Sequence, residues 1–245
     1  MKGMVNTVAE KSKYKRVLLK LSGEALAGHG GSCVDPEMLA KVAKTLKATA
    51  EAGIELALIV GAGNIWRGRQ GGDMDRVKAD HMGMLATVIN ALALADALRA
   101  AGAVAHVMSA TLLEGFAERY DRDAALAAMK RGEIVIFAGG LGIPFVSTDT
   151  AAAVRGAEIG ADVLMFAKNI DGVYSADPKK DPNAVHYDHV TYDFVLEHEL
   201  GVMDQTAASF CRENDLEILM FALSTPENIL DALCGRVRGT VLTRN

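Results

Sequence analysis

The chain has 245 residues, of which 50% are hydrophobic and 23% charged, and its formal net charge is −5. This length allows one large α/β domain or two interleaved halves, and the composition excludes a disordered chain. The negative charge argues against general affinity for nucleic acid or an anionic membrane. The three distant cysteines, Cys33, Cys211 and Cys234, suggest no disulfide framework or metal knuckle, which favours a reducing cytoplasm. We also expect no membrane-spanning segment, because no apolar run reaches the ~18–20 residues that one needs.

Apolar runs and helical periodicity predict strands alternating with helices after a flexible leader over residues 1–13. Glycine-rich loops are expected at 28–32 and 68–79. Strands are predicted at 17–21, 54–60, 104–108, 133–138, 161–167, 217–222 and 240–243, and helices at 35–52, 80–102, 121–131, 149–159, 192–200, 203–214 and 226–233.

Short connections between these elements favour an α/β fold, a three-layer α/β/α sandwich with a mainly parallel central sheet. The composition of the chain changes near residue 167, where a polar stretch that contains prolines begins. We therefore expect residues 14–245 to form a single domain, with two lobes, 14–167 and 168–245, that share one sheet.

Four predicted strands end in glycine-rich or polar turns, at 20–23, 61–68, 139–149 and 168–177. Ligands of parallel sheets bind outside the carboxyl ends of the strands, and glycine lets backbone N–H groups approach a phosphate closely. The polar side chains that these turns and the following segments carry are Lys20, Arg67, Asp80, Ser147, Thr148, Asp149, Lys168 and Asp171.

This set of groups suits phosphoryl transfer, which needs positioning and neutralisation of charge rather than a nucleophilic side chain. A Gly-Lys-Ser/Thr sequence is absent, which excludes a P-loop, and the turn at 61–66 lacks the third glycine of the dinucleotide-binding pattern. The residues alone therefore predict an α/β protein that handles phosphate groups.

Each candidate also has a purely structural interpretation. Lys20 is then an edge lysine, and Arg67 pairs with a surface carboxylate. Thr148 with Asp149, and likewise Asp80, are then helix caps, the commonest role of such residues at a helix start.

Five segments together resemble the bacterial uridylate (UMP) kinases, which belong to the amino acid kinase family. The similarity runs in the same order from about residue 14 to residue 243. The segments are Lys-Leu-Ser-Gly-Glu at 20–24, Gly-Asn-Ile-Trp-Arg-Gly at 63–68, Asp-His-Met-Gly-Met-Leu at 80–85, Ser-Thr-Asp-Thr at 147–150 and Asp-Gly-Val-Tyr-Ser-Ala-Asp-Pro at 171–178.

The resemblance implies transfer of a phosphoryl group from ATP to UMP, giving ADP and UDP, in pyrimidine nucleotide synthesis in the cytoplasm. It implies Mg²⁺ that is held mainly by the nucleotide phosphates, with no dedicated protein ligands. It further implies a homohexamer that GTP activates and UTP inhibits, with UMP in the lobe 14–167 and ATP in the lobe 168–245.

The resemblance also implies roles for single residues. Lys20, Arg67 and Asp149 are the catalytic residues it implies. The ATP-binding residues are Lys20, Leu21, Ser22, Gly23, Gly63, Arg67, Lys168, Tyr174 and Asp177. The UMP-binding residues are Ala62, Asp80, Leu141, Gly142, Ile143, Pro144, Phe145, Val146, Ser147 and Thr148.

The chain departs from its relatives at two places. Leu141 and Ile143 stand where many relatives have threonine and asparagine, so uracil selection here must rest on backbone groups or on other residues. Ala62 replaces the middle glycine of a Gly-Gly-Gly-Asn sequence, which requires a negative φ at that position.

Two other functions stay open at this stage. One is a related kinase acting on a carboxylate or carbamate, against which the ribose-binding aspartate expected at Asp80 argues. The other is a non-catalytic sensor of UTP or GTP, against which the joint presence of Lys20, Arg67 and Asp149 argues. The helix at 80–102 is a candidate oligomer face, or else is core packing throughout.

Overall fold

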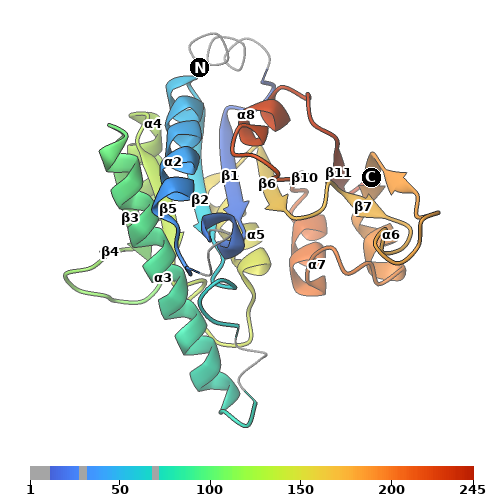
Figure 1. Ribbon diagram of the computed structural model, residues 1–245, viewed down its shortest axis with the longest axis horizontal. Coiled ribbons are helices and arrows are strands. Elements are labelled where there is room, and N and C mark those ends of the chain that lie inside the picture. Colours follow the sequence, from blue (N-terminus) through green and yellow to red (C-terminus); the bar gives the residue numbers. More distant parts are fainter. Residues whose placement is uncertain (1–11, 28–31, 68–71) are drawn as a thin grey trace.

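The computed structural model describes residues 12–27, 32–67 and 72–245, and a nine-stranded sheet runs through its centre (Figure 1). The strand order is β4-β3-β5-β2-β1-β6-β10-β11-β9. A separate two-stranded ribbon pairs β7 with β8. The strands are β1 (Arg16–Leu21), β2 (Glu55–Val60), β3 (Ala105–Ser109), β4 (Glu118–Arg119), β5 (Ile134–Ala138), β6 (Val163–Lys168), β7 (Val173–Tyr174), β8 (His186–Tyr187), β9 (His189–Thr191), β10 (Ile218–Ala222) and β11 (Gly239–Thr243).

Strand β1 occupies the middle of the sheet, between β2 and β6, and pairs with both in parallel. Its apolar side chains are buried on both faces, with Leu18 in one core and Leu19 in the other, which is why the strand is a continuous hydrophobic run. Lys20 lies opposite Ile59 of β2 and Phe166 of β6, one residue before the strand ends.

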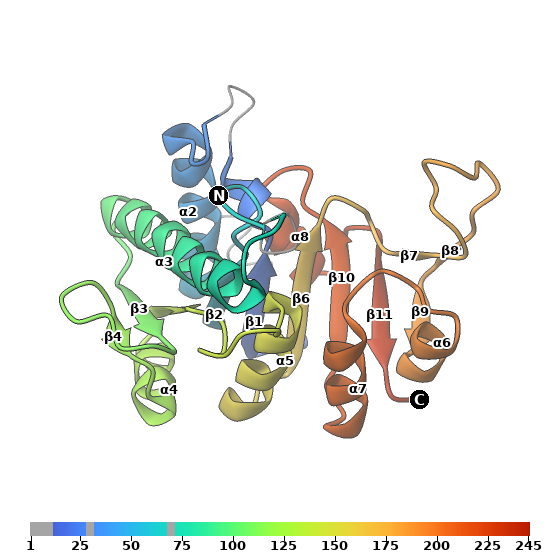
Figure 2. The ribbon, with the colours of Figure 1, turned by 90° about the horizontal axis from the view of Figure 1, so that it is seen from below.

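Helices cover both faces of the sheet, which confirms the three-layer α/β/α prediction (Figure 2). One layer holds α2 (Pro36–Glu51), α3 (Arg76–Ala100) and α8 (Asn228–Leu233). The other holds α4 (Arg122–Lys130), α5 (Thr148–Ile159), α6 (Tyr192–Glu197) and α7 (Gln205–Glu213). A short 3-10 helix, η1 (Gly23–Leu26), follows β1.

The predicted loop at 68–79 is wrong over its last part, because α3 already begins at Arg76. The carboxylate of Asp75 accepts the amide N–H of Lys78 and caps this helix, so Asp80 lies inside it and is not its cap. Residues 68–71, like 28–31 and most of the predicted leader, lie outside the described residues.

Helix α3 shows that counting uninterrupted apolar residues was too strict a test for a membrane span. Its 25 residues reach a mean hydropathy of 1.4 in the most apolar window, which length and composition alone would allow in a membrane. In the fold, 44% of that window is buried, and side chains such as Leu94 and Leu98 pack on the sheet. Packing against the sheet therefore accounts for much of this apolar composition.

The other differences are local. Ser147 caps α5, rather than Thr148 or Asp149. Helix α6 ends at Glu197, three residues before the predicted end at residue 200. The last strand, β11, runs antiparallel to β10. The two- and three-residue strands β4, β7, β8 and β9 were not predicted, because such short strands carry no periodic pattern. The division into lobes at residue 167 stays a prediction.

One close contact between α5 and β6 can be tested by substitution. A Cβ atom on Gly156 would lie 2.2 Å from Cδ2 of Leu164, so Gly156→Ala should lower the free energy of unfolding by about 1–3 kcal/mol through overpacking. In the same urea titration, Gly83→Ala on α3 should leave the free energy of unfolding unchanged or raise it by up to ~1 kcal/mol. Its Cβ would lie 3.8 Å from Cδ1 of Trp66, an ordinary contact, and alanine favours a helix more than glycine does. Equal effects of the two substitutions would contradict this packing.

Candidate active site

The predicted site residues gather at the carboxyl ends of the central strands. Lys20 comes from the end of β1 and Lys168 from the end of β6, its neighbour in the sheet. Asp149 lies in the first turn of α5, which follows β5 and packs beneath these strands. Because parallel strands end at one edge, residues far apart in sequence meet there.

The centre of the site is a carboxylate between two ammonium groups. The Nζ of Lys20 lies 2.8 Å from Oδ1 of Asp149, and the Nζ of Lys168 lies 3.3 Å from Oδ2. All three side chains are largely buried, with exposed fractions of 12% to 19%. Lys168 also donates to the carbonyl oxygen of Val202. Two cations on one anion leave an excess positive charge in a poorly solvated place, which favours an anionic ligand.

Burial and charge act against each other on these groups. Burial alone would raise the pKa of Asp149, but the charges of Lys20 and Lys168 outweigh it and hold this pKa below its usual value. Burial lowers the pKa of Lys168, and the charge of Asp149 offsets only part of that effect. Asp149 is therefore ionised at neutral pH and anchors both lysines.

Arg67 does not contact Lys20 and instead pairs with Glu24 of η1. This is the structural alternative considered for an arginine in this turn. The other oxygen of Glu24 accepts a hydrogen bond of 3.0 Å from the amide of Asn169, just after β6. The side chains of Arg67 and Glu24 are 50% and 36% exposed, so an incoming phosphate has access to the guanidinium.

The turn after β2 is packed tightly against the turn after β1. A Cβ atom on Gly23 would lie 2.2 Å from Oδ1 of Asn64 and 2.5 Å from the carbonyl oxygen of Gly61, so only glycine fits there. Asn64 and Asn90 exchange hydrogen bonds of 3.0 and 2.8 Å behind the turn. The described non-glycine residues with positive φ do not include Ala62. Its φ is therefore one that alanine adopts without strain, which is the condition for alanine to replace glycine at this position.

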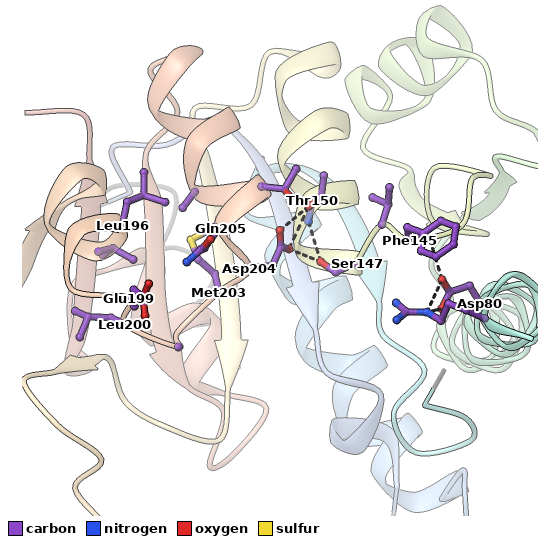
Figure 3. Close-up of a pocket in the computed structure, with 16 residues that line it drawn as sticks. Asp80, Phe145, Ser147, Thr150, Leu196, Glu199, Leu200, Met203, Asp204 and Gln205 are labelled. Atoms are coloured by element: carbon purple, nitrogen blue, oxygen red, sulfur yellow. Dashed lines mark hydrogen bonds and ion pairs between the residues drawn. The ribbon is translucent and has the colours of Figure 1, made fainter. Parts of the chain in front are cut away.

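Three neighbouring cavities lie along this edge. The first, of about 320 Å³, is lined by Ala62, Gly63, Arg67, Asp80, Val146, Ser147 and Thr148, among other residues. The second, of about 650 Å³, shares Asp80, Val146 and Ser147 with the first (Figure 3). The third, of about 460 Å³, is lined by Lys168, Tyr174 and Asp177 and shares the loop 199–201 with the second.

Asp80 is fixed at the boundary of the first two cavities. Its carboxylate accepts hydrogen bonds of 3.0 and 2.9 Å from Nε of Arg76 and one of 2.8 Å from the backbone N–H of Phe145. Phe145 holds a positive φ of 67° and is 66% exposed, which is an unusual conformation for a bulky residue. The Arg76 guanidinium lies 5.6 Å from its ring.

Several residues proposed for nucleotide binding do not line these cavities in the described structure. Leu141 packs against the core, and Ile143 is exposed to solvent. Gly142 has a positive φ of 77° and packs against Ala110. Pro144, Leu21, Ser22 and Gly23 also do not line them. Lys20 and Asp149 do not line them either, so Lys168 is the member of the ion-paired group that reaches a described cavity.

Sequence reasoning missed three polar groups of this region: Glu24, the Asn64–Asn90 pair, and Asp204. Asp204 accepts hydrogen bonds from Ser147 and Thr150 and caps α7 (Figure 3). An aspartate just before an apolar helical pattern is a cap signal, which could have revealed this capping role. The contacts of all three groups with distant segments had no signal in the sequence.

Comparison with known proteins agrees with this geometry. A model of the amino acid kinase family matches residues 15–222. The chain belongs to the amino acid kinase family. Two similar solved structures are the UMP kinases of Ureaplasma parvum and Bacillus anthracis, each with a TM-score of 0.89 and 35% sequence identity. The match to the Ureaplasma enzyme covers 94% of this chain and 99% of that enzyme. The match to the Bacillus enzyme covers 95% of this chain and 97% of that enzyme. The uridylate kinase of Archaeoglobus fulgidus matches with a TM-score of 0.70 and 28% identity, over 93% and 99% of the two chains.

Membership of this kinase family confirms the resemblance inferred from the five motifs and identifies the chain as a phosphotransferase. Of the described residues, no group of three or more His, Cys, Asp or Glu side chains is arranged to hold a metal ion. Asp149, the most buried acid of the site, already has two lysine partners.

Removing the central charge tests how this site is held together. Asp149→Asn should lower the free energy of unfolding by about 3–5 kcal/mol at pH 7, because two buried ammonium groups lose their counter-ion. The folded pKa of Asp149 lies below the unfolded value of ~3.9, so its contribution is complete above that pH and is lost as pH falls through the folded pKa.

The stability difference between wild type and Asp149→Asn, measured by urea denaturation, should therefore shrink on acidification below pH ~3.9. Asp193→Asn, which breaks an exposed pair with Arg212, is the matched control and should have little effect. A loss of stability no larger than in this control would show that Asp149 does not anchor the lysines.

Proposed function

We propose that this kinase transfers the γ-phosphoryl group of MgATP to UMP, giving ADP and UDP. The observation that carries the proposal is the ion-paired Lys20–Asp149–Lys168 group, which adjoins two cavities through its member Lys168 and through Thr148 beside Asp149. Lys168 lines the cavity of Tyr174 and Asp177, and Thr148, next to Asp149 in the chain, lines the cavity of Arg67. A donor nucleotide in the one and an acceptor in the other would present their phosphates to the same ammonium groups.

The reaction forms a bond between a UMP phosphate oxygen and the γ-phosphorus and breaks the bond to the bridging oxygen of ADP. A phosphate monoester has a second pKa of about 6, so UMP arrives as an anion and needs no general base. Lys20 and Lys168 would neutralise the charge of the transferring group, and Asp149 would hold both lysines in place. Mg²⁺ would enter with ATP on its phosphates as part of the substrate.

Arg67 would change partners when substrate binds. In the described structure Glu24 holds the guanidinium above the turn at Gly63, whose carbonyl oxygen accepts from Nε at 3.3 Å. An exposed ion pair contributes only ~0.2–1 kcal/mol, whereas a phosphate offers a bidentate partner with more charge. Arg67 would then bind phosphate, with Ala62 and Gly63 against the same group.

UMP is proposed as the acceptor because the two most similar proteins described above are UMP kinases that match over almost their whole length. Asp80 fits a ribose-binding role, since its carboxylate borders the first two cavities and is held by Arg76. Leu141 and Ile143 lack hydrogen-bonding side chains, so backbone groups of Phe145 and Val146, the members of the segment 141–146 that line these cavities, would select uracil.

The same proposal includes the physiological setting. UDP formation would serve pyrimidine nucleotide synthesis in the cytoplasm, with GTP as activator and UTP as inhibitor of a homohexamer. Helix α3 supports assembly, because Met82, Leu85 and Ile89 form an exposed apolar stripe on it, with exposed fractions of 40% to 52%. Sedimentation of the purified protein with and without GTP tests this part of the proposal.

A substrate panel tests the acceptor. ADP release should be fast with UMP, slower with CMP, and undetectable with glutamate, aspartate or carbamate, in a coupled assay with MgATP and with or without GTP. Turnover of an amino acid or carbamate without turnover of UMP would establish the related carboxylate or carbamate kinase instead. Nucleotide binding without any ADP release would establish the non-catalytic sensor.

The charge of Lys20 should act mainly in the transition state. Lys20→Ala should lower kcat about 100- to 1,000-fold and change KM for UMP much less, because the bound substrate keeps its other contacts. Lys41→Ala, which breaks an exposed pair with Glu37 on α2, is a control expected to leave both constants unchanged. A kcat equal to that of the control would remove Lys20 from the mechanism.

A further inference from the structure

We propose that Asp204 is a positioning residue, which ties the start of α7 to the start of α5 and so holds Asp149 in the place where both lysines reach it. Asp204 lies 57 residues after Ser147 and 54 residues after Thr150, its two side-chain partners. The kinetic part of this inference rests on the proposed phosphoryl transfer, but the structural part does not.

The carboxylate of Asp204 has acceptor contacts on both oxygens (Figure 3). Ser147 donates its hydroxyl hydrogen to Oδ2. The hydroxyl of Thr150 lies 2.9 Å from Oδ1 and 3.1 Å from Oδ2, and the backbone N–H of Ala207 donates to Oδ1 at 2.9 Å. Each of these partners donates, so the carboxylate of Asp204 accepts on both oxygens.

The cap of α5 depends on this carboxylate. A serine hydroxyl has one hydrogen and two lone pairs. Ser147 uses its hydrogen on Asp204, which leaves its lone pairs for the backbone N–H groups of Asp149 and Thr150, at 3.0 and 3.3 Å. Asp204 therefore fixes the orientation of the hydroxyl that holds the backbone of Asp149.

The segment that carries Asp204 also contacts Lys168, the second residue paired with Asp149. Val202, two residues before Asp204, accepts a hydrogen bond from the ammonium group of Lys168. The segment 202–204 thus contacts Lys168 directly and Asp149 through Ser147. A shift of this segment would move both Lys168 and Asp149, although the Asp204 side chain forms its hydrogen bonds with Ser147, Thr150 and Ala207.

Asp204 acts on the site through Ser147 and Thr150, and this distinguishes it from a catalytic base or a metal ligand. Its two oxygens already have partners within the chain, so using one of them for a substrate proton or a cation would cost a hydrogen bond of the α5 or α7 cap. The geometry assigns it to holding the site rather than to the chemical step.

The test compares two helix caps. Asp204→Asn replaces Oδ2 by an NH₂ group, which cannot accept from Ser147, while the remaining oxygen still accepts from Thr150 and from the N–H of Ala207 that it caps. Asp121→Asn is the matched control, because Asp121 caps α4 through the N–H of Ala124 at 2.8 Å and belongs to no part of the site.

We expect Asp204→Asn to lower kcat for UMP phosphorylation about 10- to 100-fold with a much smaller change in KM, and Asp121→Asn to leave both unchanged. Hydrogen exchange, measured without substrate, should become faster at the backbone amides of Asp149 and Thr150 in Asp204→Asn only. If Asp204→Asn does not fold, Thr150→Val removes one donor from the other side and should show the same pattern to a smaller degree.

Equal exchange at α5 in the two aspartate variants would overturn the inference, as would faster exchange with unchanged kcat. If the wild-type enzyme turns over UMP and Asp204→Asn is fully active, this inference is wrong and the proposed function is unaffected. A wild-type enzyme inactive on UMP would sink the proposed function, and the exchange measurement would still decide whether Asp204 holds α5.

Discussion

The architecture of the site depends on one buried negative charge. Asp149 is 13% exposed, and an isolated carboxylate in such a place would be costly or would lose its charge. Lys20 and Lys168 make the charge tolerable, and in doing so they bring the ends of two neighbouring strands and the start of a helix to one point. The same group holds two cations and one anion, a balance that favours an anionic ligand.

Around this fixed centre the structure places cations that are easier to redirect. Arg67 is half-exposed and paired with Glu24, and Arg76 pairs with Asp80 at the border of two cavities. The exposed pair of Arg67 with Glu24 is weak and open to competition, unlike a buried pair. The site therefore combines a buried ion-paired centre with more exposed cations around it, an arrangement that suits the proposed binding and release of two anionic nucleotides.

Most of the fold followed from patterns that span many residues. The buried run before Lys20 and the helical stripe ending near Gly53 were clear, because central parallel strands are apolar on both faces and helices repeat every 3.6 residues. Predictions failed where the signal was short or indirect. The start of α3 was placed at Asp80, which stands like a cap before an apolar run, whereas in the structure Asp75 accepts the N–H of Lys78 and the helix begins at Arg76.

The sequence by itself determined the sandwich, because composition and periodicity are local patterns, and it contained the motifs around Lys20, Arg67 and Asp149 whose resemblance to known kinases indicated the family. Only the tertiary structure decided which of these charges meet. It joined Asp149 to both lysines, held Arg67 on Glu24, and linked Asp204 to a helix more than fifty residues away. Such pairings depend on the packing of distant elements at one edge of the sheet, and no local pattern in the chain records them.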